Sequence, residues 1–301
     1  MDDCISMDTN NSNLWVHNLD LFYGSTGGDT DQAKGDGTLD TKKTDYVTMS
    51  YNHLWDSGKA SLCGMGDTEE AHITYHHNWF DHSDSRHPRV RVHSVHVYNN
   101  YYSGISKYGV GAAEGSSIFV ENNYFDNCKY PMLISMQGSD VYDQSKGTYD
   151  DKGEFSSEDG GMIKAYGNII QNIQTSKGGT YMPYDADDAT HSVQFDAYEV
   201  SSRDEKVPSS VTTLQGGTPY NNFDTDSSYD LAVDPANIDA AEDVPAIVMA
   251  GAGRVQGGDF PVNRNDYVGL TDPSSSDVDT ALKADVVSYE SSLVSVGGAA
   301  D

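Results

Sequence analysis

Three arginines lie close together in a strongly acidic chain. Arg86, Arg89 and Arg91 occur in the string RHPRVR, in a protein whose net charge is -29. Such a cluster is either a structural node of ion pairs or a place where an anionic ligand is held. The planar donors of guanidinium groups suit both roles, because they match the geometry of carboxylates.

Carboxylates and a lysine upstream of this cluster could also carry chemistry. Asp36 and Asp40 occur in the string DGTLD, Asp3 stands near the N-terminus, and Lys59 follows at a Gly-containing turn. Carboxylates that converge without partners repel one another, and oxygen-only ligation favours Ca²⁺ as the cation that relieves this repulsion. Taken alone, Asp36 and Asp40 could equally be turn residues around Gly37.

A loose repeat through the first part of the chain indicates which elements would position these residues. Each copy alternates apolar and polar residues, then has a short polar break and further apolar or aromatic residues. Period-two alternation is typical of strands, and a period in the low twenties indicates units that stack on their neighbours. The copies lie at 13–22, 46–55, 72–80, 94–102, 117–125 and 162–170.

An asparagine recurs at the same place in most copies. Asn tolerates the left-handed conformation of a sharp bend, and stacked amides can bond to one another along an axis. The pattern predicts an all-β protein, a right-handed, single-stranded parallel β-helix. A leucine-rich repeat would need regular leucines, a propeller a period of about 40 residues, and a β-sandwich does not explain the asparagines. These are Asn52, Asn78, Asn100, Asn123 and Asn168, with Leu19 in the first copy.

The candidate residues precede this position by 9 to 19 residues in their own copies. Residues of similar phase in successive coils of a β-helix stack on one side, at a spacing of about 4.8 Å. We therefore expect one face, over about four coils, to carry Asp3, Asp36, Asp40, Lys59, Arg86 and Arg91.

The expected organisation is one large domain with irregular additions. Residues 1–256 are predicted to form the β-helix, with a polar loop insertion over 138–161 and an irregular part over 181–256. A short helix that ends at glycine is predicted within 237–253. Residues 257–301 are expected to be a tail or linker.

Composition excludes several classes of protein and of site. The acidity disfavours nucleic acid as a partner, and no apolar run approaches the roughly 20 residues of a membrane span. The N-terminus has no signal-peptide pattern. Cys4, Cys63 and Cys128 are widely spaced and form no CxxC, so zinc is disfavoured. Buried free thiols are expected, with one disulfide and a leftover thiol as the alternative.

At this point several strings together resemble a known family. They are YVTMSYNHLWDSGKASLCG, HITYHHNWFDHSDSRHPRVR, VHVYNNYY and FVENNYF, preceded by Asp3 and DGTLD. This order is similar to the pectate lyases of polysaccharide lyase family 1, over about residues 2–170, and the AGAGR string at 250–254 resembles the family's C-terminal part. The resemblance implies a pectin lyase-like β-helix that cleaves polygalacturonate by β-elimination with Ca²⁺.

The resemblance also implies roles for individual residues. Arg86 matches the catalytic base, and Lys59 and Arg91 match residues that bind substrate carboxylates, while Arg89 stays unassigned. The calcium-binding carboxylates of the family match Asp3, Asp36 and Asp40. Arg86 would act as a base although Arg is normally protonated; neighbouring positive charges disfavour its cationic form, so an alkaline optimum is expected.

Histidine offers a rival base, because it is the usual one. His76, His77, His82 and His87 lie near the cluster, but most occupy strand positions beside Tyr and Asn, where packing explains them.

The start of the chain departs from the family pattern. Family members have further coils, a capping helix and a signal peptide before the position of Asp3, so we expect an N-terminally truncated part of a secreted, monomeric enzyme. Two other functions stay open. One is a pectin lyase that acts on methyl-esterified chains without Ca²⁺, and the other is a non-catalytic β-helix that binds polysaccharide. Retention of Asp36 and Asp40 argues against the first, and the retained basic residues argue against the second.

Overall fold

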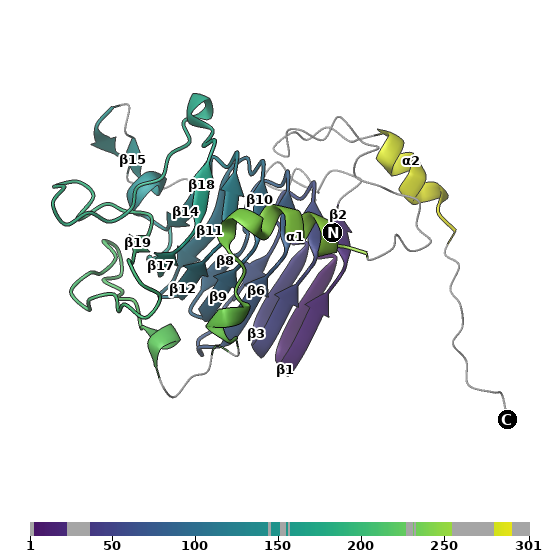
Figure 1. Cartoon of the computed structure of the whole chain (residues 1–301), viewed down its shortest axis with the longest axis horizontal. Helices are drawn as coiled ribbons and strands as arrows, with labels where there is room; N and C mark the ends of the chain where they lie inside the picture. The colour runs from purple at the N-terminus through teal and green to yellow at the C-terminus, as the bar shows by residue number, and fades with distance from the viewer. Residues whose placement is uncertain are drawn as a thin grey trace.

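The computed structural model of the chain describes residues 3–22, 37–143, 146–150, 155, 157–226, 231, 233–254 and 280–290. The strands of its two large sheets pair in parallel and lie side by side in successive coils, from β1 at one end to β17 and β19 at the other (Figure 1). The predicted parallel β-helix is therefore confirmed.

Three faces make up the coils. One is a sheet of three-residue strands, with bounds Asp20–Phe22 (β2), His53–Trp55 (β4), Trp79–Asp81 (β7), Tyr101–Ser103 (β10), Tyr124–Asp126 (β13) and Ile169–Gln171 (β18). The second holds His72–His76 (β6), Ser94–Tyr98 (β9), Ser117–Glu121 (β12), Met162–Tyr166 (β17) and Tyr198–Glu199 (β19). The third holds Leu62–Cys63 (β5), Arg89–Arg91 (β8), Tyr108–Ala113 (β11) and Tyr130–Ile134 (β14).

Two longer strands join the second and third faces. Ile5–His17 (β1) pairs with Leu39–Ser50 (β3), and β3 in turn pairs with both β5 and β6. The third face begins at β5 and continues through β8, β11 and β14. The segments that carry the candidate residues therefore lie next to one another along this face. Repetition of the coil thus places residues that are 20 to 30 positions apart in the sequence next to one another.

Inside the coils, apolar side chains stack in register. Ile73, Val95 and Ile118 are successive partners on the second face, and none is more than 1% exposed. The rings of Tyr102 and Phe125 stack at 4.2 Å between centroids on the first face. Because each coil offers the same inward positions, the apolar alternation of the repeat becomes one continuous core.

The recurrent asparagines form a buried ladder. Asn52 donates through Nδ2 to Oδ1 of Asn78 at 3.0 Å, and each later amide donates to the next at the same distance. In the first copy, the backbone N–H of Leu19 donates to Asn52 Oδ1 at 3.2 Å. The predicted amide stack is confirmed.

The conformation expected at this bend was assigned to the wrong residue. The ladder asparagines do not have positive φ; the residue before each one does, as at His77 (φ 53°) and Asn99 (φ 51°). Each ladder asparagine, whose side chain bonds along the axis, therefore directly follows the residue that has the left-handed conformation.

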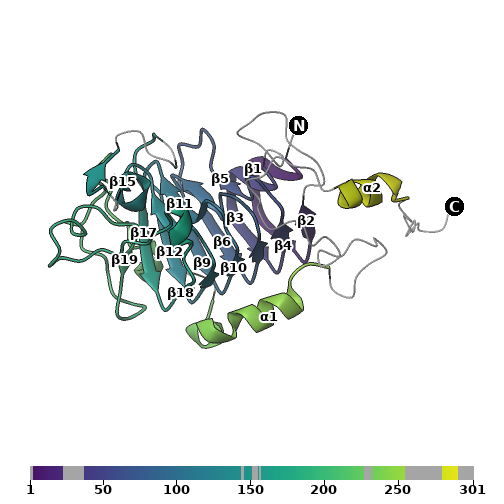
Figure 2. The ribbon, with the colours of Figure 1, turned by 90° about the horizontal axis from the view of Figure 1, so that it is seen from above.

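Elements outside the coils cover parts of this core. Helix Val244–Gly251 (α1) follows a 3₁₀ turn and lies along one side of the coils (Figure 2), where Val244 and Val248 pack with Tyr101. The helix predicted within 237–253 is thus confirmed. Tyr142–Asp143 (β15) and Thr148–Tyr149 (β16) form an antiparallel hairpin in the predicted insertion. Thr280–Ser288 (α2) lies in the predicted tail.

The described helices include none that is long and apolar enough to span a bilayer. The three cysteines form no disulfide; Cys63 and Cys128 are buried as expected, but Cys4 is exposed. The domain boundaries at 138–161, 181–256 and 257–301 stay predictions.

Candidate active site

Two carboxylates from successive coils converge at Gly37. Asp3 accepts a hydrogen bond through Oδ1 from the backbone N–H of Gly37 at 3.0 Å, and Asp40 accepts through Oδ1 from the N–H of Leu62 at 2.8 Å. A Cβ added to Gly37 would overlap with Asp3 Oδ1 and Asp40 Oδ2. Only glycine therefore leaves room for both carboxylates, and their oxygens line a common space.

The electrostatics of this space favour a cation. Burial raises the pKa of Asp40 to about 7, the N–H of Leu62 opposes that rise, and the negative charge of Asp3 adds to it. Lys42 lies 3.4 Å from Asp3 Oδ2 and offsets part of the charge. A carboxylate whose pKa is raised by burial and by a like charge gains from a bound cation.

The donors present fit a hard cation such as Ca²⁺. Both described groups are carboxylates, the ligand type that Ca²⁺ prefers. The third predicted ligand, Asp36, lies outside the described residues, and no group of three His, Cys, Asp or Glu side chains suited to a metal occurs among those that are described. The structure thus brings together Asp3 and Asp40, and their role as ligands stays a prediction.

Lys59 and Arg86 follow on the next two coils. Lys59 forms parallel bridges with Gly37 on one side and with Ser85 on the other, so it sits between the carboxylates and the arginine cluster. Arg86 directly follows Ser85, has a φ of 67°, and its carbonyl accepts from the N–H of Ser61 at 2.7 Å. Positive φ at a non-glycine residue marks a constrained position.

The guanidinium of Arg86 differs from those of its neighbours. In the described part of the chain it forms no hydrogen bond and no ion pair, although its charge lowers the pKa of both Asp40 and Tyr108 against the effect of burial. It is half-buried. The residue predicted to be the base therefore lies beside the carboxylate site with its side chain unengaged.

Arg89 and Arg91 share one carboxylate. Glu158 accepts from Arg89 Nη2 at 2.7 Å and from Arg91 Nε and Nη2 at 2.9 and 2.5 Å, and Arg91 Nη1 donates to the carbonyl of Gly64 at 3.3 Å. Burial would raise the pKa of Glu158, but the two arginines hold it below its ordinary value. Arg91 still has two N–H groups for a ligand, since guanidinium carries five.

Glu158 is a residue that the sequence reasoning missed. It belongs to the predicted insertion, where its carbonyl accepts from Ser135 Oγ at 2.8 Å, and the carbonyl of Asp159 accepts from the N–H of Glu114 at 2.7 Å. An acidic residue in a polar insertion carries no periodic signal, so no pattern in the sequence could have placed it against the arginines.

The histidines are engaged in packing or in hydrogen bonds. His87 is fully buried, which lowers its pKa to about 4, and its Nδ1 lies 2.8 Å from the carbonyl oxygen of Tyr108. His77 Nε2 lies 2.8 Å from Asp239 Oδ2. Burial and the neighbouring His77 lower the pKa of His76 to about 3. These contacts favour the structural interpretation of the histidines.

Comparison with known families identifies the chain. The family model described as "Pectate lyase" matches residues 1–166, which is more than half of the sequence. The chain belongs to the pectate lyase family. The expected family is thereby confirmed.

Curated pectate lyases are similar to part of the chain. It is 34% identical over 143 residues to the pectate trisaccharide-lyase of Bacillus licheniformis, covering 46% of this chain and 41% of that protein. It is 36% identical over 139 residues to pectate lyase B of Dickeya chrysanthemi, covering 43% and 36%. The match thus spans about two fifths of the length of these relatives.

Solved pectate lyases share the fold. Pectate lyase II from Xanthomonas campestris aligns with a TM-score of 0.54 at 24% identity, over 83% of this chain and 64% of that one. Pectate lyase C in complex with pentagalacturonic acid aligns with a TM-score of 0.53 at 23% identity, over 85% and 60%. At these identities the likeness supports the parallel β-helix and nothing finer.

Proposed function

We propose that the chain is the catalytic part of a pectate lyase that cleaves polygalacturonate, an α-1,4-galacturonan, by Ca²⁺-dependent β-elimination. The observation that carries the proposal is the sequence of groups on one face. The carboxylates over Gly37 come first, Lys59 follows on the next coil, and Arg86, whose guanidinium pairs with none of the described side chains, follows on the one after. Pectate lyase C, which shares the fold, has been solved with pentagalacturonic acid and, in another structure, with Ca²⁺.

Asp3 and Asp40, with Asp36, would hold the cation. Bound there, Ca²⁺ supplies positive charge for the carboxylate of the uronate being cleaved. Lys59, on the next coil, would donate to the same substrate carboxylate, where negative charge grows when the C5 proton leaves. Arg91 uses its two remaining N–H groups to bind a neighbouring uronate carboxylate while Glu158 fixes its orientation.

Arg86, in its deprotonated form, accepts the proton from C5 of the uronate. The C5–H bond breaks, a C4–C5 double bond forms, and the C4–O glycosidic bond breaks with its electron pair on the leaving oxygen. Water supplies the proton to that oxygen, and the hydroxide that remains takes the proton from Arg86, which returns to its deprotonated form. The products are a reducing chain end and a 4,5-unsaturated oligogalacturonide. The enzyme would act as a secreted monomer on extracellular polymer.

Ultraviolet absorbance of the unsaturated product tests the proposal. The full chain is mixed with polygalacturonate and, separately, with methyl-esterified pectin, each with and without a chelator. We expect absorbance to rise on polygalacturonate alone, and only without the chelator. Chelator-insensitive cleavage of methylated pectin would make the protein a pectin lyase, and binding without any product would leave a polysaccharide-binding β-helix.

A further inference from the structure

The main chain at Arg86 has an uncommon conformation. Its φ of 67° lies in the left-handed region, which non-glycine residues rarely adopt. Such a conformation persists where the surrounding structure fixes it. The side chain of Arg86 does not fix it, because among the residues that the structure describes its guanidinium forms no hydrogen bond and no ion pair. The position of this guanidinium therefore depends on the contacts of the main chain beside it.

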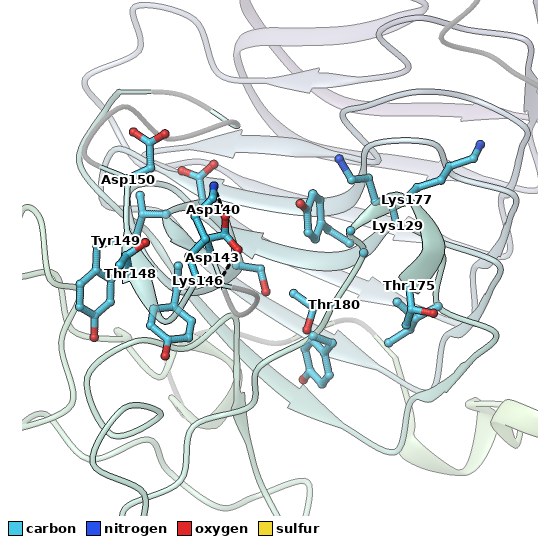
Figure 3. A pocket seen from close by; sticks show the side chains of 18 residues that line it. Lys129, Asp140, Asp143, Lys146, Thr148, Tyr149, Asp150, Thr175, Lys177 and Thr180 are labelled. Carbon is cyan, nitrogen blue, oxygen red and sulfur yellow. Dashed lines mark hydrogen bonds and ion pairs between the residues drawn. The ribbon is translucent and has the colours of Figure 1, made fainter.

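The insertion that engages the other two arginines of the cluster does not engage Arg86. Glu158 accepts hydrogen bonds from both of the others. The hairpin of β15 and β16 forms one wall of a hollow of about 970 Å³, and Lys129 and Lys177 stand on the opposite wall (Figure 3). Within its described ranges, the insertion forms no hydrogen bond or ion pair with the Arg86 side chain. The contacts that fix Arg86 therefore come from the coils.

The next residue, His87, is anchored to the following coil at three points. Its backbone N–H donates to the carbonyl of Gly109 at 2.9 Å, and its Nδ1 lies 2.8 Å from the carbonyl oxygen of Tyr108. Its own carbonyl accepts from the hydroxyl of Tyr102 at 3.0 Å. Because a carbonyl oxygen only accepts, Nδ1 of His87 carries the proton and donates it. Residues of β10 and β11 thus hold both the main chain and the side chain of His87.

The environment of His87 makes it unsuited to proton transfer. The residue is fully buried, and burial lowers its pKa to about 4, although the carbonyl of Tyr108 acts in the opposite direction. Its Nε2 has no hydrogen-bond partner in the described part of the chain. Its ring packs edge-on against Phe80, at 5.2 Å between centroids. The contacts of His87 therefore serve the position of the chain beside Arg86.

The hydroxyl of Tyr102 stands in an otherwise apolar row of the core. The Tyr102 ring stacks between Phe80 and Phe125, at 5.0 and 4.2 Å between centroids, so phenylalanine would fill the same space. Burying a hydroxyl costs free energy unless it is hydrogen-bonded, and the packing of the row does not require one. The hydroxyl occurs in the coil where the carbonyl of His87 can accept from it. The other members of the row are Leu21, Leu54, Phe80, Phe125 and Ile170.

We propose that Tyr102 and His87 are positioning residues for Arg86, because they fix the main chain from which its guanidinium projects. This rests on the proposed function, in which Arg86 accepts the C5 proton. A base must lie within hydrogen-bond reach of the proton that it takes, and a displacement of about 1 Å can cost about 100-fold in rate. Loss of either anchor would let the main chain at Arg86 relax without removing a group that contacts the substrate.

Steady-state rates on polygalacturonate test this inference with Tyr102→Phe, which removes the hydroxyl and keeps the ring. We expect kcat to fall about tenfold and KM to stay unchanged, because the groups that bind the uronate carboxylates are untouched. His87→Leu should also lower kcat. His87→Asn should lower it less than His87→Leu, because the side-chain amide of Asn can still donate to the carbonyl of Tyr108.

Tyr220→Phe is the matched control, because it removes a buried hydroxyl elsewhere. Tyr220 is 2% exposed, and its hydroxyl donates at 2.7 Å to Asp224, which pairs with Lys164 of β17 on the second face. This variant should lower the thermal midpoint as Tyr102→Phe does, but leave kcat unchanged. Equal losses of kcat in the two variants would overturn the positioning role. An unchanged kcat in Tyr102→Phe, with or without a higher KM, would overturn it as well.

Amide hydrogen exchange tests the same anchor without turnover. The N–H of Ser61 donates to the carbonyl of Arg86 at 2.7 Å, so its exchange reports on the main chain there. Relative to Asn78 in the ladder, we expect Ser61 to exchange about tenfold faster in Tyr102→Phe, the factor for one lost buried hydrogen bond. Tyr220→Phe should leave this ratio unchanged.

The two measurements separate failure of the inference from failure of the proposed function. An unchanged exchange ratio in Tyr102→Phe would overturn the inference, whether or not the chain cleaves polygalacturonate. If the unsubstituted chain forms no unsaturated product, the proposed function fails. The exchange ratio then still shows whether the Tyr102 hydroxyl holds the main chain at Arg86.

Discussion

At the scale of single residues, the partners of the three clustered arginines separate their roles. Arg89 and Arg91 are tied to Glu158, whereas Arg86 has no ion pair in the part of the chain that the structure describes. A guanidinium held by a carboxylate keeps its proton more firmly, because the pair favours the charged form. Of the three, Arg86 is the one whose guanidinium no described carboxylate holds, and its role as the base stays a prediction.

Replacing Arg86 with Ala should abolish turnover and preserve the fold. The loss of a general base is worth about 10²- to 10⁴-fold in rate, and removing a side chain that makes no ion pair costs little stability. Initial rates of product absorbance and the thermal midpoint measure the two effects. Arg254→Ala is the control, since Arg254 pairs with Asp20 away from the site. Turnover that survives Arg86→Ala would move the base elsewhere.

Replacing Glu158 with Gln should destabilise the protein at neutral pH. Arg89 is only 8% exposed and would lose its charged partner; breaking a fully buried pair costs about 3–5 kcal/mol, so at this partly exposed site we expect about 1–2 kcal/mol. Urea unfolding measures it. Glu114→Gln is the control, because Glu114 is more exposed and lies 3.8 Å from Arg91.

The pH dependence of this effect follows from the lowered pKa of Glu158. A carboxyl whose pKa is lower in the folded than in the unfolded protein stabilises the fold at pH values above its unfolded pKa, here about 4.5. That stabilisation is lost as the pH falls through the lower pKa of the folded protein. The stability difference between the native protein and Glu158→Gln should therefore shrink below pH 4.5. A difference that stays constant down to acidic pH would mean that charge is not its cause.

At the scale of elements, the asparagine ladder fixes each coil against the next. Asn78 accepts from both the backbone N–H and Nδ2 of Asn52 at 3.0 Å, and donates to the carbonyl of Met49 at 2.8 Å. All of these groups are out of reach of solvent at the inner bend, where an unpaired polar group costs about 1–3 kcal/mol. The ladder thus supplies partners for backbone groups that the turn leaves out of the sheets.

Asn78→Ala should therefore lower the free energy of unfolding by about 2–4 kcal/mol, because more than one buried group loses its partner. Chemical denaturation of the two proteins measures the change. Asn168→Ala should cost less, since Asn168 is half-buried at the end of the ladder, where it accepts from Asn123 and donates to the carbonyl of Val120 at 2.8 Å. Equal losses at the two positions would argue that the internal amides do not depend on one another.

At the scale of the whole molecule, the carboxylate site joins segments that are distant in the sequence. Asp3 precedes β1 and Asp40 lies in β3, and they meet only because the two strands pair in register. A cation held by both would bind the folded chain and not the unfolded one, and so it would stabilise the fold by mass action.

Calcium should consequently raise the thermal midpoint of the protein. At a free concentration 100 times the dissociation constant, the gain is about 2.7 kcal/mol. Calorimetric scans with Ca²⁺ and with chelator measure it. Asp40→Asn should lose the gain while its side-chain oxygen still accepts from Leu62, and Asp8→Asn, on the exposed side of β1, should keep it. A gain that persists in Asp40→Asn would place the cation elsewhere.

The sequence by itself determined the coils, because their signal is local and repeated. Alternation within 72–80 or 94–102 sets which side chains turn inward, and the recurrent asparagines mark the bend in every copy. The phase of Lys59 and Arg86 relative to that bend was enough to predict that they would share a face. Local patterning also predicted the helix that became α1.

Only the tertiary structure decided the contacts that depend on non-repeating segments. Glu158 reaches Arg89 across 69 positions through an insertion that has no period, and the fit of Asp3 and Asp40 over Gly37 depends on a strand register that alternation cannot specify to one residue. Periodicity determines whether a side chain points into or out of the coil. The strand register and the path of the insertion determine which other side chain lies next to it.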